Sequence, residues 1–144
     1  MAIFESEAQI YAVMQAVFER LAANPTQIES FTHSNLVIRI LLANPTAEIL
    51  LDGRQPPLEV FYGSRPGRAN VEVSLEADLL HNIWLSHQSM TEALFSGKIK
   101  TKGNVMKASK LIDLFRECER VYPDVIATLN LSETNSTERP AGLF

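Results

Sequence analysis

Hydrophobic residues near the start of the chain recur every three or four positions, which is the spacing of an amphipathic helix. The apolar stripe runs from Ile10 to Leu21, and Asn24-Pro25 follows it as a stop signal. Ser6 and Gln9 precede the stripe with capping-box spacing, in which a serine oxygen accepts a bond from a free backbone N–H. The sequence therefore predicts a first helix over residues 6–23.

Alternating apolar and polar positions follow this helix, as is typical of strands whose two faces meet different surroundings. Asn44-Pro45, Asp52-Gly53 and Pro56-Pro57 interrupt the alternation and predict turns. A loop is expected over residues 63–68, GSRPGR. Four strands are thus expected, around residues 36–42, 49–51, 58–62 and 71–75.

Helical spacing returns after the fourth strand. A first apolar stripe ends at Trp84, and Ser89 with Glu92 forms a second capping-box pattern that opens a short helix. A longer amphipathic helix is expected from about Val105, with Pro123 ending it or starting a short last one.

The segment FSGKIKTKGNVMKASK, residues 95–110, contains every lysine of the chain. Gly97 is expected to end the short helix in a left-handed conformation, and Gly103-Asn104 to form a turn that opens the long helix. Between them, strand alternation predicts Ile99 and Thr101 on one face. Three lysines would share the other face: Lys98, Lys100 and Lys102.

This order of helices and strands predicts an α+β domain with a mostly antiparallel sheet. Its central motifs are VEVSL, EADLL and ALFSGKIKTKGN, and together they resemble the sterol carrier protein 2 (SCP2) sterol-binding domain. The resemblance implies a five-stranded sheet covered by helices, with an apolar cavity between sheet and helices. The residues that carry it are Asp78, Phe95, Gly97, Lys98, Lys100, Gly103 and Asn104.

The resemblance also implies a lipid-binding carrier that is not an enzyme and needs no cofactor. Its expected ligand is apolar and long, either fatty acyl, isoprenoid or sterol-like. The same side chains would be ordinary core residues in a protein without a cavity. The candidate cavity-lining residues are Phe18, Leu80, Ile83, Trp84, Met90, Leu94, Ile99, Met106 and Phe115.

Length predicts one domain, and composition predicts a flexible tail over residues 132–144, where Ser, Thr, Asn, Glu and Pro dominate. The resemblance implies that the domain, over residues 1–131, is an SCP2-like lipid-binding domain. A single cysteine, Cys118, excludes an internal disulfide and favours a reducing compartment. Together with the absence of a signal-peptide pattern or a long apolar run, this predicts a cytoplasmic protein. The sequence specifies no oligomeric state.

The net charge of −4 argues against nucleic acid as a partner. The lysine segment is the one local exception, and Lys98, Lys100 and Lys102 are candidates for transient docking on an anionic membrane surface. Lysines on an exposed strand also protect a sheet edge from pairing with another chain, and that interpretation remains open.

Catalytic and metal-binding interpretations are weaker. Asp78, His81 and His87 lack the spacing of a strong metal motif, and Ser86 and Ser89 have no nucleophile elbow around them. Cys118 lies on the apolar side of its helix, which favours packing over reactivity. The leading hypothesis is therefore a non-catalytic carrier. The alternative is an accessory or interaction subunit that presents lipid or quinone intermediates to biosynthetic enzymes, with or without a ligand of its own.

Overall fold

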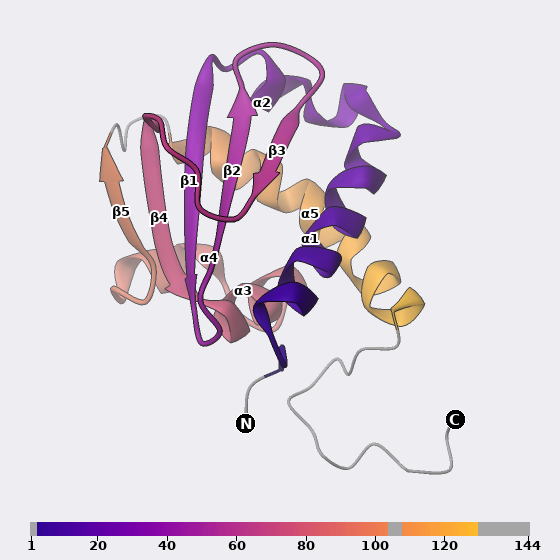
Figure 1. The fold of residues 1–144 in the computed structure, drawn as a ribbon, viewed down its shortest axis with the longest axis vertical. Helices are drawn as coiled ribbons and strands as arrows, with labels where there is room; N and C mark the ends of the chain where they lie inside the picture. The colour runs from indigo at the N-terminus through magenta and orange to yellow at the C-terminus, as the bar shows by residue number, and fades with distance from the viewer. Residues whose placement is uncertain (1–2, 104–107, 130–144) are drawn as a thin grey trace.

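The computed structural model of the chain describes residues 3–103 and 108–129 (Figure 1). The expected tail over residues 132–144, and with it the boundary at residue 131, lies outside the described residues, as do Asn104 and Met106. The elements, in chain order, are α1 (Glu7–Ala22), the 3-10 helix η1 (Pro25–Ile28), α2 (Glu29–Thr32), β1 (Leu36–Ala43), β2 (Ala47–Gly53), β3 (Glu59–Tyr62), β4 (Val71–Glu76), α3 (Ala77–Trp84), α4 (Met90–Phe95), β5 (Lys100–Gly103) and α5 (Ala108–Thr128).

The five strands form one sheet in the order β3-β2-β1-β4-β5. β1 runs parallel to β4, and the other three pairings are antiparallel. The predicted α+β class, with a mostly antiparallel five-stranded sheet, is confirmed. Periodicity did not predict the parallel pair, because the pairing of β1 with β4 joins segments separated by two other strands.

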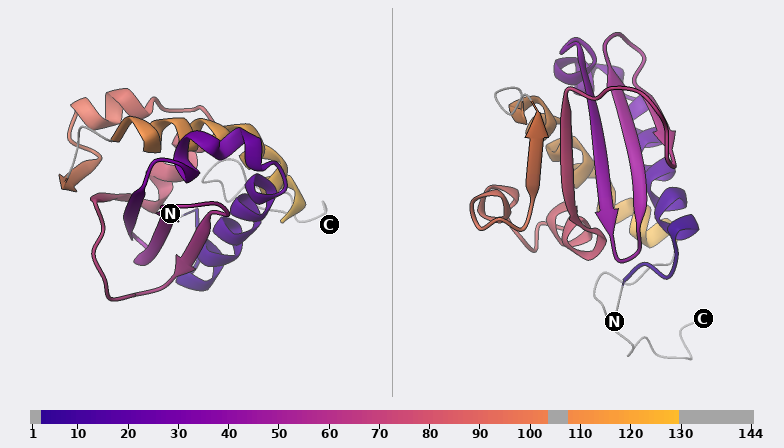
Figure 2. Two further views of the ribbon diagram at one scale, coloured as in Figure 1. Left: turned by 90° about the horizontal axis from the view of Figure 1, so that it is seen from above. Right: turned by 60° about the vertical axis from the view of Figure 1, so that its left-hand side comes forward.

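The helices lie on one face of the sheet, and the connection between β3 and β4 crosses the opposite face (Figures 1 and 2). We call these the inner face and the outer face. Strand register decides which side chains each face receives. One row on the inner face is Tyr62, Ile49, Ile40, Val73 and Thr101, one residue from each strand.

The middle of the inner row is buried, whereas Thr101 on the edge strand β5 is exposed. The neighbouring row, on the outer face, is Phe61, Leu50, Arg39, Glu72 and Lys102. Apolar side chains therefore fill the helix-covered side of the central strands, and charged side chains belong to the outer side.

Arg39 fixes the connection between β3 and β4 over the outer face. Its guanidinium forms ion pairs with Glu48 at 3.0 Å and with Glu72 at 3.4 Å. It also donates hydrogen bonds to the carbonyl oxygens of Arg65 at 3.0 Å and Gly67 at 3.1 Å. Hydrogen bonds from an ionised guanidinium are stronger than those between neutral groups, so these contacts hold the connection in place.

Both expected capping serines bond as predicted. Ser6 Oγ accepts from Gln9 N at 3.1 Å, and Ser89 Oγ accepts from Glu92 N at 3.2 Å. Gly97 has the expected left-handed conformation, with φ of 83°. The helix starts and this helix end were therefore readable from short-range sequence patterns.

Two expectations about the second half of the chain were wrong. Lys98 does not belong to the strand, because β5 begins at Lys100 and the backbone N–H of Lys98 donates to the Ala93 carbonyl in the turn that closes α4. Helix α5 continues through Pro123 to Thr128. Tyr122 and Val125 on either side of this proline are fully buried, and their packing outweighs the cost of the lost hydrogen bond.

Candidate functional site

The candidate lining residues converge between the sheet and the helices. Met90 and Leu94 are partly buried and pack against a single hydrophobic cluster, which we call the apolar layer. Met106 lies outside the described residues. The other six candidates are buried members of the apolar layer: Phe18, Leu80, Ile83, Trp84, Ile99 and Phe115.

Trp84 lies at the centre of an aromatic group within the apolar layer. Its side chain is 0% exposed, and its ring meets Phe115 edge to face at 5.2 Å and Tyr122 at 5.3 Å. The indole nitrogen Nε1 is buried and has no hydrogen-bond acceptor among the described residues. Buried indole N–H groups usually find a partner, so Trp84 places an unused donor inside an apolar environment.

The apolar layer contains a polar pair that sequence reasoning missed. His81 Nδ1 and Tyr122 Oη lie 2.6 Å apart, both residues are fully buried, and Phe4 packs edge to face on the imidazole at 5.7 Å. Burial raises the pKa of Tyr122 well above its usual value of 10, and the nearby Asp78 adds to the shift. His81 shares the helix face of Leu80 and Trp84, and this spacing was the available signal.

The residues weighed for metal binding or hydrolysis have separate environments. Asp78 Oδ1 accepts from the backbone N–H of Ile3 at 3.0 Å, His81 points into the apolar layer, and His87 is exposed in the loop after α3. Among residues 3–103 and 108–129 there is no group of three or more His, Cys, Asp or Glu residues placed to hold a metal ion.

Cys118 is fully buried, and burial raises the pKa of its thiol well above the usual value. The thiolate is the reactive form, so this environment suppresses reactivity at neutral pH. The interpretation of Cys118 as a packing residue agrees with this position.

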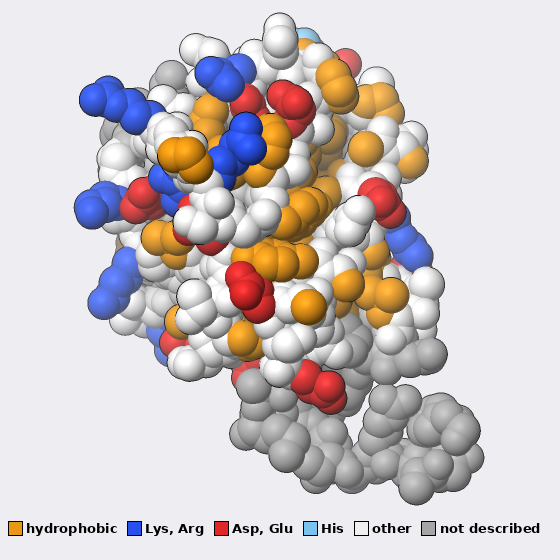
Figure 3. All heavy atoms as spheres, viewed as in Figure 1, with side chains coloured by type: hydrophobic (Ala, Val, Ile, Leu, Met, Phe, Trp, Pro, Cys, Tyr) orange, Lys and Arg blue, Asp and Glu red, His pale blue; other side chains and the backbone are white. Residues whose placement is uncertain are grey.

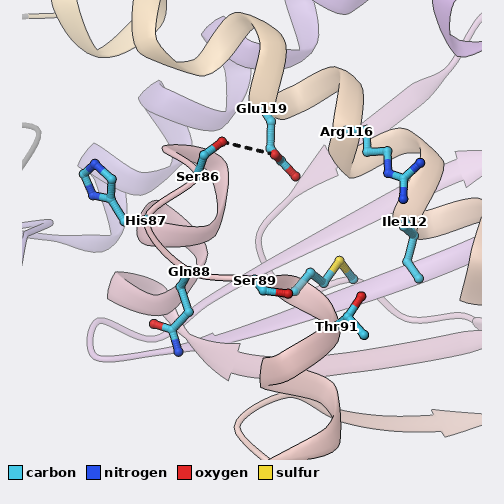
Figure 4. Close-up of a pocket in the computed structure, with 9 residues that line it drawn as sticks. Ser86, His87, Gln88, Ser89, Thr91, Ile112, Arg116 and Glu119 are labelled. Carbon is cyan, nitrogen blue, oxygen red and sulfur yellow. Dashed lines mark hydrogen bonds between the residues drawn. The ribbon is translucent and has the colours of Figure 1, made fainter.

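A surface pocket lies where the loop between α3 and α4 meets α5, and its volume is about 340 Å³ (Figure 4). α5 contributes Ile112, Arg116 and Glu119, and the other lining residues come from the segment 86–91. Ser86 has a left-handed backbone, with φ of 64°, and its hydroxyl donates to Glu119 Oε1 at 3.3 Å. No sequence pattern indicated this pocket, because its two walls are distant in the chain.

A second hollow, of about 300 Å³, lies beside the lysine segment. Lys98 and Lys100 line it together with apolar side chains from the ends of β1 and β4, among them Leu41 and Leu75. Lys and Arg side chains gather toward the β5 edge of the outer face (Figure 3). Neither hollow is lined by Trp84 or Phe115, so the expected cavity inside the apolar layer stays a prediction.

The model of the SCP-2 sterol transfer family matches residues 15–116, which include all five strands of the sheet together with Trp84 and Phe115. The chain belongs to the SCP-2 sterol transfer family. A comparison with curated proteins gave no match.

Solved structures share the fold of this SCP-2 family member. Sterol carrier protein 2 from Yarrowia lipolytica has a TM-score of 0.59 and 24% identity, over 78% of this chain and 91% of that one. The sterol carrier protein domain 2 of Helicoverpa armigera has a TM-score of 0.63 and 20% identity, over 77% of this chain and 88% of that one. A ubiquinone synthesis protein, UbiJ-SCP2, has a TM-score of 0.55 and 19% identity, over 79% of this chain and 91% of that one. At these identities the likeness establishes the fold alone.

No helix of the SCP-2 domain, within its described residues, is long and apolar enough to cross a membrane.

Proposed function

We propose that this SCP-2 domain is a non-catalytic carrier that holds a long apolar ligand, fatty acyl, isoprenoid or sterol-like, between its sheet and its helices. The observation that supports the proposal is the apolar layer itself, where eight of the nine candidate residues meet in one cluster. Burial of apolar ligand surface there would contribute about 25 cal/mol per Å². Binding of this kind needs shape and apolar area, not a reacting group.

Helix α4 is the wall of the apolar layer that is best suited to move. It buries only Ala93 fully, whereas α3 buries six residues of comparable size or larger. Gly97 ends α4 in a left-handed conformation, with open space around its Cα. Segments with few buried contacts open at the lowest free-energy cost, so ligand would enter beside α4.

Trp84 provides the experiment, because it is the only tryptophan of the chain and lies within the apolar layer. Purified protein would be examined by native mass spectrometry and lipid extraction. Stripped protein would then be titrated with hexadecanoic acid, a prenol and a sterol while Trp84 emission is followed. For a carrier, the change in Trp84 emission should saturate near one ligand per chain. Lipid-free protein with unchanged emission for all three ligands would overturn the proposal.

The accessory-subunit alternative draws on the fold likeness to UbiJ-SCP2, whose name describes a ubiquinone synthesis protein. Phe95 also supports this alternative, because its ring is 88% exposed on α4 and is large enough to anchor a partner protein. An accessory subunit without its own ligand would leave Trp84 emission unchanged and would lose partner binding on Phe95→Ala.

We further propose that the carrier docks on anionic membranes through Lys98, Lys100 and Lys102. All three side chains are exposed, and the hollow beside Lys98 and Lys100 combines cations with apolar walls. Each cation near an anionic surface contributes about 1 kcal/mol. Edge protection remains the competing role, because β5 is an edge strand and its lysines also discourage pairing with another chain.

A further inference from the structure

A further hollow lies on the outer face of the sheet, where the connection between β3 and β4 crosses it, and its volume is about 570 Å³. We call it the outer-face hollow. Near the top of this face, side chains of both charges surround apolar ones (Figure 3). Its floor includes Val37 and Leu50, which are buried and yet do not belong to the apolar layer. The outer-face hollow is therefore separate from the space between the sheet and the helices.

Arg65 and Phe61 form a stacked pair in the outer-face hollow. The Arg65 guanidinium lies over the Phe61 ring, 3.8 Å from the ring centroid. Arg39 holds the backbone of the connection through the carbonyl oxygens of Arg65 and Gly67, so the path of the chain there does not depend on the Arg65 side chain. Because Arg65 is exposed, a second planar ring can stack on the side of its guanidinium that turns away from Phe61.

Arg68 supplies another guanidinium, which is attached at the β1 side of the outer-face hollow. Asn70, two residues later, is bonded to β1 twice: its backbone N–H donates to the Val37 carbonyl oxygen, and its side-chain oxygen accepts from the Val37 N–H, both at 2.7 Å. Arg68 is exposed and forms no ion pair with any residue that the structure describes. A free guanidinium suits a phosphate group, which it can bind through two parallel hydrogen bonds.

Two carboxylates line the same hollow, and they differ in their partners. Asp52 is engaged by Arg54, with 2.7 Å between Oδ2 and Nη2 and 3.0 Å between Oδ1 and Nε. Glu59 is exposed and has no ion pair within residues 3–103 and 108–129. Strand register places Glu59 opposite Asp52 and Asp52 opposite Val37, so Glu59 is attached two strands from Val37, which is about 10 Å. The free carboxylate and the Arg68 guanidinium are thus attached at opposite sides of the outer-face hollow.

These groups match the three parts of a nucleotide. A base can stack on a guanidinium plane, a phosphate can pair with a free arginine, and a ribose hydroxyl can donate to a carboxylate, as in dinucleotide sites. The volume of about 570 Å³ is within the range of about 300–1,000 Å³ that is usual for small-molecule sites. A net charge of −4 disfavours a nucleic acid strand, which carries many phosphates.

We propose that the outer-face hollow binds a single nucleoside monophosphate. The base stacks on Arg65 above Phe61, the phosphate pairs with Arg68, and the ribose donates to Glu59. This site lies on the opposite side of the sheet from the apolar layer, so it is additional to the proposed carrier function and does not depend on it.

The test titrates adenosine 5′-monophosphate into the full chain, with isothermal titration calorimetry for the affinity and amide chemical shifts by NMR for the location. Adenosine and inorganic phosphate are titrated separately as the two halves of the ligand. The nucleotide should bind at least about tenfold more tightly than either half, which corresponds to one charge-assisted bond. The shifts should be concentrated in Val37, Leu50 and residues 59–68, and the indole signal of Trp84 should not move.

Arg68→Gln should weaken binding of the nucleotide about tenfold and leave the affinity for adenosine unchanged, because it removes only the phosphate partner. Arg65→Lys keeps the positive charge but loses the flat guanidinium, so it should weaken binding of the nucleotide and of adenosine alike. Both side chains are exposed, and urea denaturation should show that the two variants are as stable as the parent.

Arg120→Gln is the matched control, because it removes one arginine charge from α5, outside the outer-face hollow. It should bind the nucleotide as the parent does. The nucleotide site would be overturned if the parent bound the nucleotide no more tightly than phosphate, or if Arg68→Gln and Arg120→Gln had equal effects. Equally tight binding of O-phosphotyrosine would also overturn it, since the hollow would then recognise any aromatic phosphate. None of these results bears on the carrier function, which is read from Trp84.

Discussion

His81 Nδ1 and Tyr122 Oη lie 2.6 Å apart, and this bond joins α3 to α5 between residues 41 positions apart in the chain. Both side chains are fully buried, so neither can exchange the bond for one with water. The relationship makes the packing of the two helices specific, because only one relative position of α3 and α5 satisfies both polar groups.

Tyr122→Phe should lower the free energy of unfolding by about 1–3 kcal/mol, since it leaves a buried polar nitrogen of His81 without this partner. Urea denaturation at neutral pH measures the change. Tyr62→Phe is the control, because the Tyr62 hydroxyl makes no hydrogen bond with the described residues and its loss should cost less than about 0.5 kcal/mol. Equal costs for the two variants would show that the bond contributes nothing.

Stability should fall in alkali because burial raises the pKa of Tyr62 to about 12, with a further contribution from Glu19. In the unfolded chain the same phenol ionises near its usual pKa of 10. The folded state therefore retains a proton that the unfolded state releases. The stabilisation is complete below pH 10 and is lost as the pH rises toward 12.

Tyr62→Phe should accordingly flatten the loss of stability across this alkaline range, as measured by urea denaturation at several pH values. Part of the loss should remain, because burial also raises the pKa values of Tyr122 and Cys118. A variant that loses stability as steeply as the parent would contradict the assignment to Tyr62.

Gly103→Ala should destabilise the protein more than Gly97→Ala. Both glycines have positive φ, 101° and 83°, which costs any other residue about 1–2 kcal/mol. A Cβ on Gly103 would in addition collide with the carbonyl oxygen of Asn70, whereas a Cβ on Gly97 meets open space. Thermal melts of the two variants measure the difference. Equal melting temperatures would mean that the end of β5 moves to avoid the collision at no cost in stability.

Replacement of Lys98, Lys100 and Lys102 by glutamine should weaken binding to anionic vesicles at least about tenfold and should flatten its dependence on salt. Cosedimentation with vesicles of phosphatidylserine and phosphatidylcholine at several salt concentrations measures both effects. Binding of hexadecanoic acid, followed through Trp84, should not change.

The control for the lysine variant is the triple replacement of Arg20, Lys110 and Arg120, which changes the net charge equally but lies on α1 and α5. It should bind vesicles nearly as the parent does. If the parent shows no vesicle binding, or if both triple variants lose it equally, the lysines do not form a docking site and edge protection remains their role.

The sequence by itself determined which helices and strands form and where most of them begin and end. The helical spacing of apolar residues and the capping residues placed the first helix, and the structure confirms its Ser6 cap. The alternation of apolar and polar residues, together with the turn residues, placed four strands of the sheet. These patterns are readable because backbone preferences and burial periodicity act over a few neighbouring residues. For the same reason local rules failed at Pro123, where the burial of Tyr122 and Val125 by distant elements overrides the local cost of proline.

Only the tertiary structure decided which of these residues act together. The sequence could name Trp84 and Phe115 as apolar, but it could not place their rings 5.2 Å apart or bury an indole N–H without an acceptor. It gave no reason to group Arg68 with Leu50, which line one hollow from different elements. Such groupings depend on contacts between segments far apart in the chain, and these exist only when the sheet has formed and the helices have packed on its inner face.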